Sequence, residues 1–197
     1  MITKTQIEIM KVFAGKINER FSIKEVSEII KKPYPLVHRS IKGLIENNFL
    51  LKDNKNLISL NYKENFQIIS YIEALRASQF LKDKTINLFA KDVLNKIGSD
   101  FFIFLIFGSS VESKNPKDID VLIIIENKEK INETEKIVSN ISLNFSKKFD
   151  INVISSESAY EMLNKRDSVN ILNETLNKHI LLYGAESYYR ILKNARR

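Results

Sequence analysis

Two aspartates separated by one residue are the first candidates for chemistry in this sequence. Asp118 and Asp120 begin a segment that continues as the apolar run 121–125. Side chains alternate along a strand, so both carboxylates would lie on one face. Such close carboxylates repel each other unless a cation lies between them, and a divalent cation shared with substrate phosphates meets this need. The pair therefore predicts a Mg²⁺ or Mn²⁺ site.

A third aspartate, Asp150, belongs to another predicted strand. The segment 148–154 alternates in polarity and places Asp150 and Asn152 on one face. In a shared sheet, Asp150 could lie beside the Asp118/Asp120 pair. Three acids could hold two metal ions for in-line phosphoryl transfer, or two could hold metal while Asp150 accepts the proton of an attacking hydroxyl. We assign catalytic and metal-binding roles to Asp118, Asp120 and Asp150.

A Gly-Ser-Ser sequence follows the apolar run 101–107, which is typical of a buried central strand. Glycine lets the backbone approach a ligand closely. A turn or helix that starts at the first serine would offer free N–H groups to phosphate oxygens, and a serine hydroxyl adds a further donor. The residues that we predict to bind nucleotide are Gly108, Ser109, Ser110 and Lys117.

Residues 1–62 read as three helices and a strand pair. Apolar residues recur at helical spacing over 6–15, and Ser22 with Glu25 forms a capping box for a helix that runs to about Lys32. Pro35 suits the first turn of a third helix. Strands over 49–52 and 57–60 enclose a polar turn. This order resembles a winged helix-turn-helix.

A winged helix would place its third helix in a DNA major groove. The alternatives are a protein-binding module or a basic face that is only solvated. Residues 1–62 carry 11 basic and 6 acidic side chains, a net charge of +5, against +7 for the whole chain, so the charge favours nucleic acid. The residues predicted to contact DNA are Tyr34, His38, Arg39, Lys42, Lys52 and Lys55.

The stretch 64–97 has helical periodicity and predicts a connector over residues 63–98. It is one long helix or two, with a break near residues 82–84, and Gly98-Ser99 ends it. The connector would join the N-terminal part to a third region, residues 99–197. The whole chain is therefore expected to be α+β, with a mixed sheet and flanking helices in the third region.

Composition narrows the function classes. The chain has no cysteine, which excludes disulfides, thiolate metal sites and cysteine nucleophiles. No signal peptide is evident, and the longest apolar run is far too short to span a membrane. We expect a cytoplasmic protein with no membrane contact. The sequence leaves the oligomeric state open, with a homodimer as one alternative.

Gly108-Ser109, eight intervening residues, the Asp118/Asp120 pair and the later Asp150 together resemble the polymerase-beta-type nucleotidyltransferase superfamily. More narrowly, they are similar to the minimal nucleotidyltransferases of prokaryotes, which include antitoxin-type protein adenylyltransferases. Segment 180–184, after a helix predicted over 169–178, also resembles the close of such domains. The resemblance covers about residues 99–185.

The resemblance implies a metal-dependent transfer of AMP from ATP, or of another nucleotide from its triphosphate, to a hydroxyl acceptor such as a cognate toxin. Many family members continue the Gly-Ser with a small residue, arginine and glycine, whereas segment 110–114 here reads SVESK. Lys114 or Lys117 could supply the charge without the forked geometry of arginine. The alternative is a DNA-binding regulator or antitoxin-type protein whose nucleotidyltransferase domain senses nucleotides or is inactive.

Overall fold

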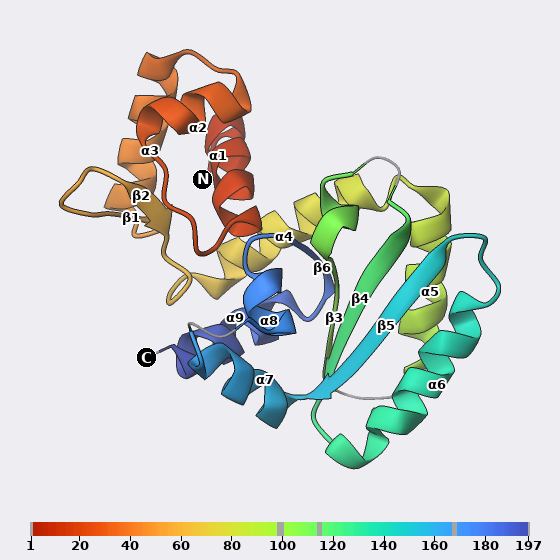
Figure 1. Ribbon diagram of the computed structural model, residues 1–197. Helices are drawn as coiled ribbons and strands as arrows, with labels where there is room; N and C mark the ends of the chain where they lie inside the picture. Colours follow the sequence, from red (N-terminus) through yellow and green to blue (C-terminus); the bar gives the residue numbers. More distant parts are fainter. Residues whose placement is uncertain (1, 98–100, 114–115, 167–168, 197) are drawn as a thin grey trace.

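The computed structural model describes residues 2–97, 101–113, 116–166 and 169–196 of a mixed α/β protein (Figure 1). Within these residues, no helix has the length and apolar character needed to cross a membrane. The helices are α1 (Lys4–Gly15), α2 (Ile23–Ile30), α3 (Tyr34–Glu46), α4 (Phe66–Phe80), α5 (Lys84–Lys96), α6 (Ile131–Ser142), α7 (Ser156–Asn164), α8 (Ile171–Thr175) and α9 (Ala185–Ala195), with short 3₁₀ helices η1 (Gly108–Val111) and η2 (Lys128–Lys130). The strands are β1 (Leu50–Lys52), β2 (Ile58–Leu60), β3 (Phe102–Phe107), β4 (Asp118–Ile125), β5 (Lys148–Ser155) and β6 (His179–Tyr183).

Residues close to the helix ends set the boundaries of the N-terminal helices. The predicted capping box of α2 is confirmed, because the Ser22 hydroxyl accepts the Glu25 N–H while the Glu25 carboxylate accepts the Ser22 N–H. The same helix ends at Ile30, two residues earlier than predicted. Lys31 adopts a left-handed conformation with φ of 53°, which stops the helix. Pro35 lies in the first turn of α3, as predicted.

The β1–β2 hairpin packs next to these helices. The strands are antiparallel, with Leu50 opposite Leu60. Phe21, between α1 and α2, adds a backbone bridge to β2, since it exchanges N–H···O bonds of 3.0 and 2.8 Å with Ile58. In the polar turn, the Asp53 carboxylate accepts the N–H groups of Lys55 and Leu57. The turn is therefore closed by its own sequence.

The connector consists of two separate helices in the described residues, which decides between the two alternatives left by its periodicity. Asp83 ends the interruption between α4 and α5, because its carboxylate accepts the N–H groups of Thr85 and Ile86 at 3.0 and 3.1 Å. The predicted stop at Gly98-Ser99 lies outside the described residues.

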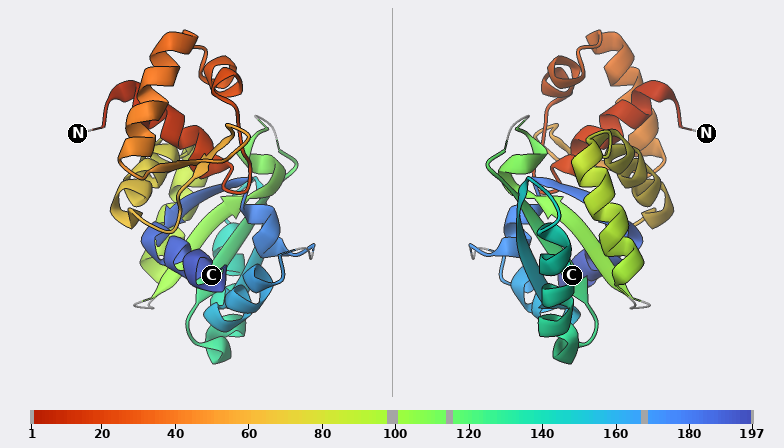
Figure 2. Two further views of the ribbon diagram at one scale, coloured as in Figure 1. Left: turned by 90° about the vertical axis from the view of Figure 1, so that its left-hand side faces the viewer. Right: turned by 90° about the vertical axis from the view of Figure 1, so that its right-hand side faces the viewer.

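In the described residues, four strands form an open mixed sheet in the order β5-β4-β3-β6. β3 is antiparallel to both neighbours, whereas β4 and β5 are parallel and are joined across a face of the sheet by α6. Helices α5 and α6 lie side by side over one face (Figure 2). Helices α4, α7, α8 and α9 lie toward the other (Figure 1).

The hydrophobic core follows the alternation of the strands. In β4, Ile119, Val121 and Ile123 pack toward α5 and α6, while Leu122 and Ile124 pack toward the opposite helices. This second cluster continues through α4 and α9 into α1 and α3, so the N-terminal helices and the sheet share apolar packing. The boundaries near residues 62 and 98 stay predictions.

The helix predicted over residues 169–178 is shorter than expected. It occupies Ile171–Thr175 as α8, because the Asn170 side chain caps its start and accepts the Asn173 N–H at 2.9 Å. Strand β6 then begins at His179. This early switch places the α8–β6 loop beside the end of β3, where the Gly-Ser turn begins.

Candidate active site

The pairing of β4 with β5 brings the three predicted aspartates together. Asp120 stands directly opposite Asp150, and Asp118 stands opposite Lys148. Neighbouring strands lie about 4.8 Å apart, so the two opposed aspartates are close. All three carboxylates share the face of Leu122 and Ile124, the side of the sheet toward α7, α8 and α9. The expected position of Asp150 beside the pair is confirmed, and its role in catalysis stays a prediction.

The surroundings of Asp120 disfavour its charge. Its half-buried position raises the pKa of its carboxyl, and the negative charges of Asp118, Asp150 and Glu174 raise that pKa further. Among the described residues, the ion pair that the three aspartates make is a long one, since the exposed Lys148 Nζ lies 3.9 Å from Asp118 Oδ2. The site therefore holds an excess of negative charge.

Glu174 was missed by the sequence analysis. It is an exposed residue of α8, 24 residues beyond Asp150, in a helix too short to show periodicity. Its place near Asp120 depends on how α8 packs against the sheet face. No local signal in the sequence could have found it.

The Gly-Ser turn touches the acids directly. Gly108 has φ of +72°, and a Cβ added there would collide with Asp120 Oδ2. Its N–H donates to the Lys178 carbonyl at 3.1 Å, which fastens the turn to the α8–β6 loop. Only glycine fits this backbone conformation and this close approach without strain. The close neighbour at Gly108 is Asp120, and the approach of the backbone to a bound ligand stays a prediction.

The other predicted nucleotide-binding residues differ in how accessible their polar groups are. Ser109 is exposed in η1, whereas Ser110 is buried and donates its hydroxyl to the Phe107 carbonyl at 2.9 Å. Lys117 is exposed immediately before Asp118. Lys114 lies outside the described residues. A further lysine, Lys178, reaches the end of the turn and pairs with Glu112 at 3.2 Å.

Carboxylate oxygens on adjacent strands are the ligand type that Mg²⁺ and Mn²⁺ prefer, and the crowded charge around Asp120 fits a divalent cation. In the described part of the chain, however, no group of three or more His, Cys, Asp or Glu side chains is gathered tightly enough to hold an ion. The donor set therefore fits the metal in chemistry and location, without a preformed ligand cage.

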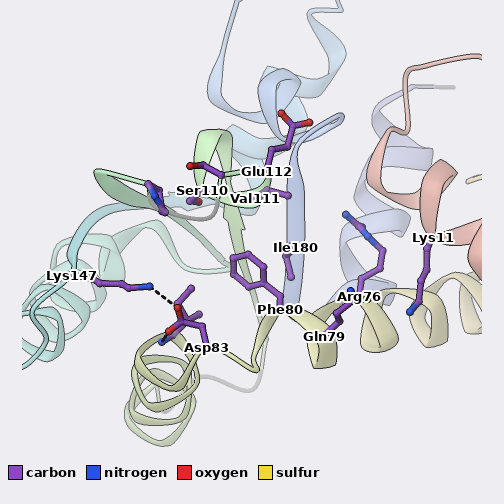
Figure 3. Close-up of a pocket in the computed structure, with 13 residues that line it drawn as sticks. Lys11, Arg76, Gln79, Phe80, Asp83, Ser110, Val111, Glu112, Lys147 and Ile180 are labelled. Carbon is purple, nitrogen blue, oxygen red and sulfur yellow. Dashed lines mark hydrogen bonds and ion pairs between the residues drawn. The ribbon is translucent and has the colours of Figure 1, made fainter. Parts of the chain in front are cut away.

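A cleft of about 500 Å³ lies beside the end of the turn (Figure 3). None of the three aspartates lines it. Its apolar wall includes Phe80, Ile86 and Val111, which pack with the cluster between the sheet and α5. The lining comes from α1, the α4–α5 junction, β6, the segment that follows Gly108-Ser109 and Lys147 before β5, so the cleft is a separate feature from the three aspartates.

The surface predicted to contact DNA is gathered on α3. A shallow hollow is lined by Tyr34, Pro35, His38, Arg39 and Lys42. The rings of Tyr34 and His38 lie 5.9 Å apart. Lys52 and Lys55 are exposed on and beside β1 of the hairpin.

A buried polar network lies behind the turn and was also missed by the sequence analysis. Glu73 of α4 is fully buried and contacts Arg76, His179 and Tyr189 at 2.6, 3.2 and 2.7 Å. Burial raises the pKa of Glu73, but Arg76 and His179 outweigh it and hold that pKa below its ordinary value. Arg76 also donates to the His179 carbonyl at 2.6 Å, so α4 is tied to β6.

Comparisons of the chain with models of protein families, with curated proteins and with solved structures found no match.

Proposed function

We propose that this protein is a metal-dependent nucleotidyltransferase that moves a nucleoside monophosphate, AMP from ATP being the first candidate, to a hydroxyl acceptor. The observation that supports it most is the meeting of Asp118, Asp120 and Asp150 on one sheet face beside the Gly108 turn. A site of this kind needs carboxylates for metal and a close backbone approach for phosphates. Both lie within one small region.

Each residue has a defined task in this proposal. Asp118 and Asp120 would hold Mg²⁺ or Mn²⁺, with Asp150 as the third carboxylate, and the bound ion would neutralise charge on the triphosphate. Gly108 lets the chain pass close to Asp120, and the exposed Ser109 hydroxyl and Lys117 ammonium would face phosphate oxygens.

The transfer itself is a substitution at the α-phosphorus of the nucleotide. The acceptor oxygen forms a bond to this phosphorus. The bond between the phosphorus and the oxygen that bridges it to the β-phosphate breaks, and pyrophosphate leaves. The hydroxyl proton passes to Asp150. Asp150 suits this role because it is exposed, whereas Asp118 and Asp120 are half-buried. The acceptor, such as a cognate toxin, would meet the site at the exposed Asp150.

Incubation with α-labelled nucleotides, Mg²⁺ or Mn²⁺ and candidate acceptors tests the activity. We expect label on the protein or its acceptor, and none in the Asp118→Ala or Asp120→Ala variants. Glu126→Ala is the matched control, because it removes an exposed acid just beyond the far end of β4. Label that persists in both aspartate variants, or a wild type that neither transfers nor binds nucleotide, would contradict the proposal.

A second candidate function is nucleic-acid binding by a winged helix formed by residues 1–62. It is favoured by the gathering of Tyr34, His38, Arg39 and Lys42 around one hollow of α3. Basic and aromatic side chains on an exposed helix are suited to phosphates and base edges. In this reading the acid site senses nucleotide or acts alongside DNA binding.

Mobility-shift titrations at several salt concentrations test this second function. Arg39→Ala and Lys42→Ala should each weaken binding, and the affinity should fall as salt rises. Lys91→Ala, an exposed lysine of α5 on the far side of the chain from α3, is the control. Undetectable or salt-insensitive binding by the wild type argues against DNA contact.

A further inference from the structure

We propose that the cleft of about 500 Å³ between α1, the α4–α5 junction and the end of η1 is a second binding site, and that its ligand is a nucleoside monophosphate. The proposal goes beyond the transfer reaction, because it concerns a cleft that none of the three aspartates lines. A cleft of this volume matches the usual size range of small-molecule sites, about 300–1,000 Å³.

The lining combines an apolar wall with a small number of polar groups. Phe80, Ile86 and Val111 supply the apolar wall, and Figure 3 shows the Phe80 ring between Lys147 on one side and Arg76 on the other. A flat ring of a ligand can stack on or lie against an aromatic side chain. Gln79 is exposed at the edge and carries both a donor and an acceptor, which suits the edge of a base.

The charges of the lining favour an anion at one end. Lys147 is matched by Asp83 at 2.6 Å, and Glu112 is matched by Lys178 at 3.2 Å. Lys11 of α1 has no ion-pair partner among the described residues, so its charge remains available at the end of the cleft near Arg76. An anionic group such as a phosphate would bind at this end.

A ligand in this cleft would lie next to the turn that contacts the acid site. Part of the cleft lining is Ser110, Val111, Glu112 and Ser113, the continuation of the turn whose first residue, Gly108, lies against Asp120. A ligand that contacts Lys11 and this turn would bridge the N-terminal helices and the backbone beside the aspartates. A ligand in the cleft would therefore act on the acid site through this turn.

The test is a calorimetric titration of the full-length protein with AMP, GMP, CMP and UMP in the presence of EDTA, which measures the affinity for each. Adenosine and inorganic phosphate are titrated as partial ligands. We expect at least one monophosphate to bind more tightly than phosphate or nucleoside alone. Lys11→Met should weaken it at least tenfold, the effect of losing about one charge-assisted hydrogen bond. Gln79→Leu should change the preference among bases.

Matched variants separate this site from the proposed transfer site. Lys4→Met removes a lysine from the same helix outside the cleft and should bind normally. The Asp118→Asn/Asp120→Asn double variant should also bind normally, because the aspartates do not line the cleft. Thermal melts confirm that each variant is folded.

The outcomes are decisive in both directions. Absence of binding by all four monophosphates at millimolar concentration, or equal affinity in Lys11→Met, Gln79→Leu and the wild type, overturns the second site. Binding lost in the aspartate double variant but retained in Lys11→Met assigns the nucleotide to the acid site and also overturns it. Loss of label transfer with retained monophosphate binding in the double variant would leave both proposals standing.

Discussion

Glu73 and Asp120 are acidic residues in opposite electrostatic surroundings. Glu73 is fully buried, yet Arg76 and His179 hold its pKa below the ordinary value despite burial. Asp120 is only half-buried, yet burial and the charges of Asp118, Asp150 and Glu174 raise its pKa. Burial acts in the same direction on both, so the neighbouring charges decide the outcome. The negative charge of the structural acid Glu73 is balanced by its neighbours, whereas the negative charge of the candidate ligand-binding acid Asp120 is not.

The largest effect should come from removing the charge of Glu73. Glu73→Gln leaves the Arg76 guanidinium, which is only 10% exposed, without its anionic partner. Breaking a buried ion pair from one side costs about 3–5 kcal/mol of unfolding free energy. Urea unfolding followed by circular dichroism measures the loss. Glu112→Gln, which breaks an exposed pair, should lose less than about 1 kcal/mol; equal losses in the two variants would refute the contrast.

A smaller loss is expected at the turn. Gly108→Ala places a Cβ at positive φ and against the Asp120 carboxylate, and holding such a conformation costs about 1–3 kcal/mol. The Gly108→Ala/Asp120→Ala double variant removes the collision but not the backbone strain. Comparison of the single and double variants by urea unfolding should therefore give a non-additive recovery. Strict additivity would mean that Gly108 and Asp120 do not interact.

Removal of the Asp120 charge should have the opposite sign. Asp120→Asn relieves repulsion with the acids around it and should leave stability unchanged or raise it by less than about 1 kcal/mol, the scale of cross-strand charge pairs. The same variant should lose nucleotide transfer. Unfolding is measured in EDTA, so that metal does not mask the repulsion. A marked loss of stability would show that Asp120 has a structural partner.

Acidification should change the stability with opposite signs at the two acids. The pKa of Glu73 is lowered from 4.5, so its contribution is present above pH 4.5 and is lost as pH falls through its folded-state pKa. The pKa of Asp120 is raised from 3.8, so its penalty is present at neutral pH and is lost as pH falls through its folded-state pKa. From pH 7 to 3, the advantage of wild type over Glu73→Gln should shrink, and the advantage of Asp120→Asn over wild type should also vanish.

Short-range patterns in the sequence predicted many of the helices and strands. The capping box of Ser22 and Glu25 starts α2 as predicted, and alternation places Asp118 and Asp120 on one face. The strand pattern around Asp150 gave the face of its side chain, and the pairing of β4 with β5 placed it beside the other two. Capping and alternation depend on residues within a few positions of one another, so the sequence contains them.

The errors lie at element ends and in contacts over long separations. Helix α8 is shorter than the helix predicted over 169–178, because the Asn170 cap and the start of β6 limit it. Glu73 and His179 are 106 positions apart and come together only when α4 packs on β6. A buried acid and histidine at such a distance look like surface residues in the sequence.

The sequence by itself determined the strands, the turn and the alternation that directs Asp118, Asp120 and Asp150, since each follows from short-range geometry. The tertiary structure decided which charges surround them. It placed Glu174 near the three aspartates, paired Glu73 with Arg76, and opened the cleft that Ser110 and Val111 line. Charge interactions and cavities depend on distances through space, and those are fixed only when the helices pack on the sheet.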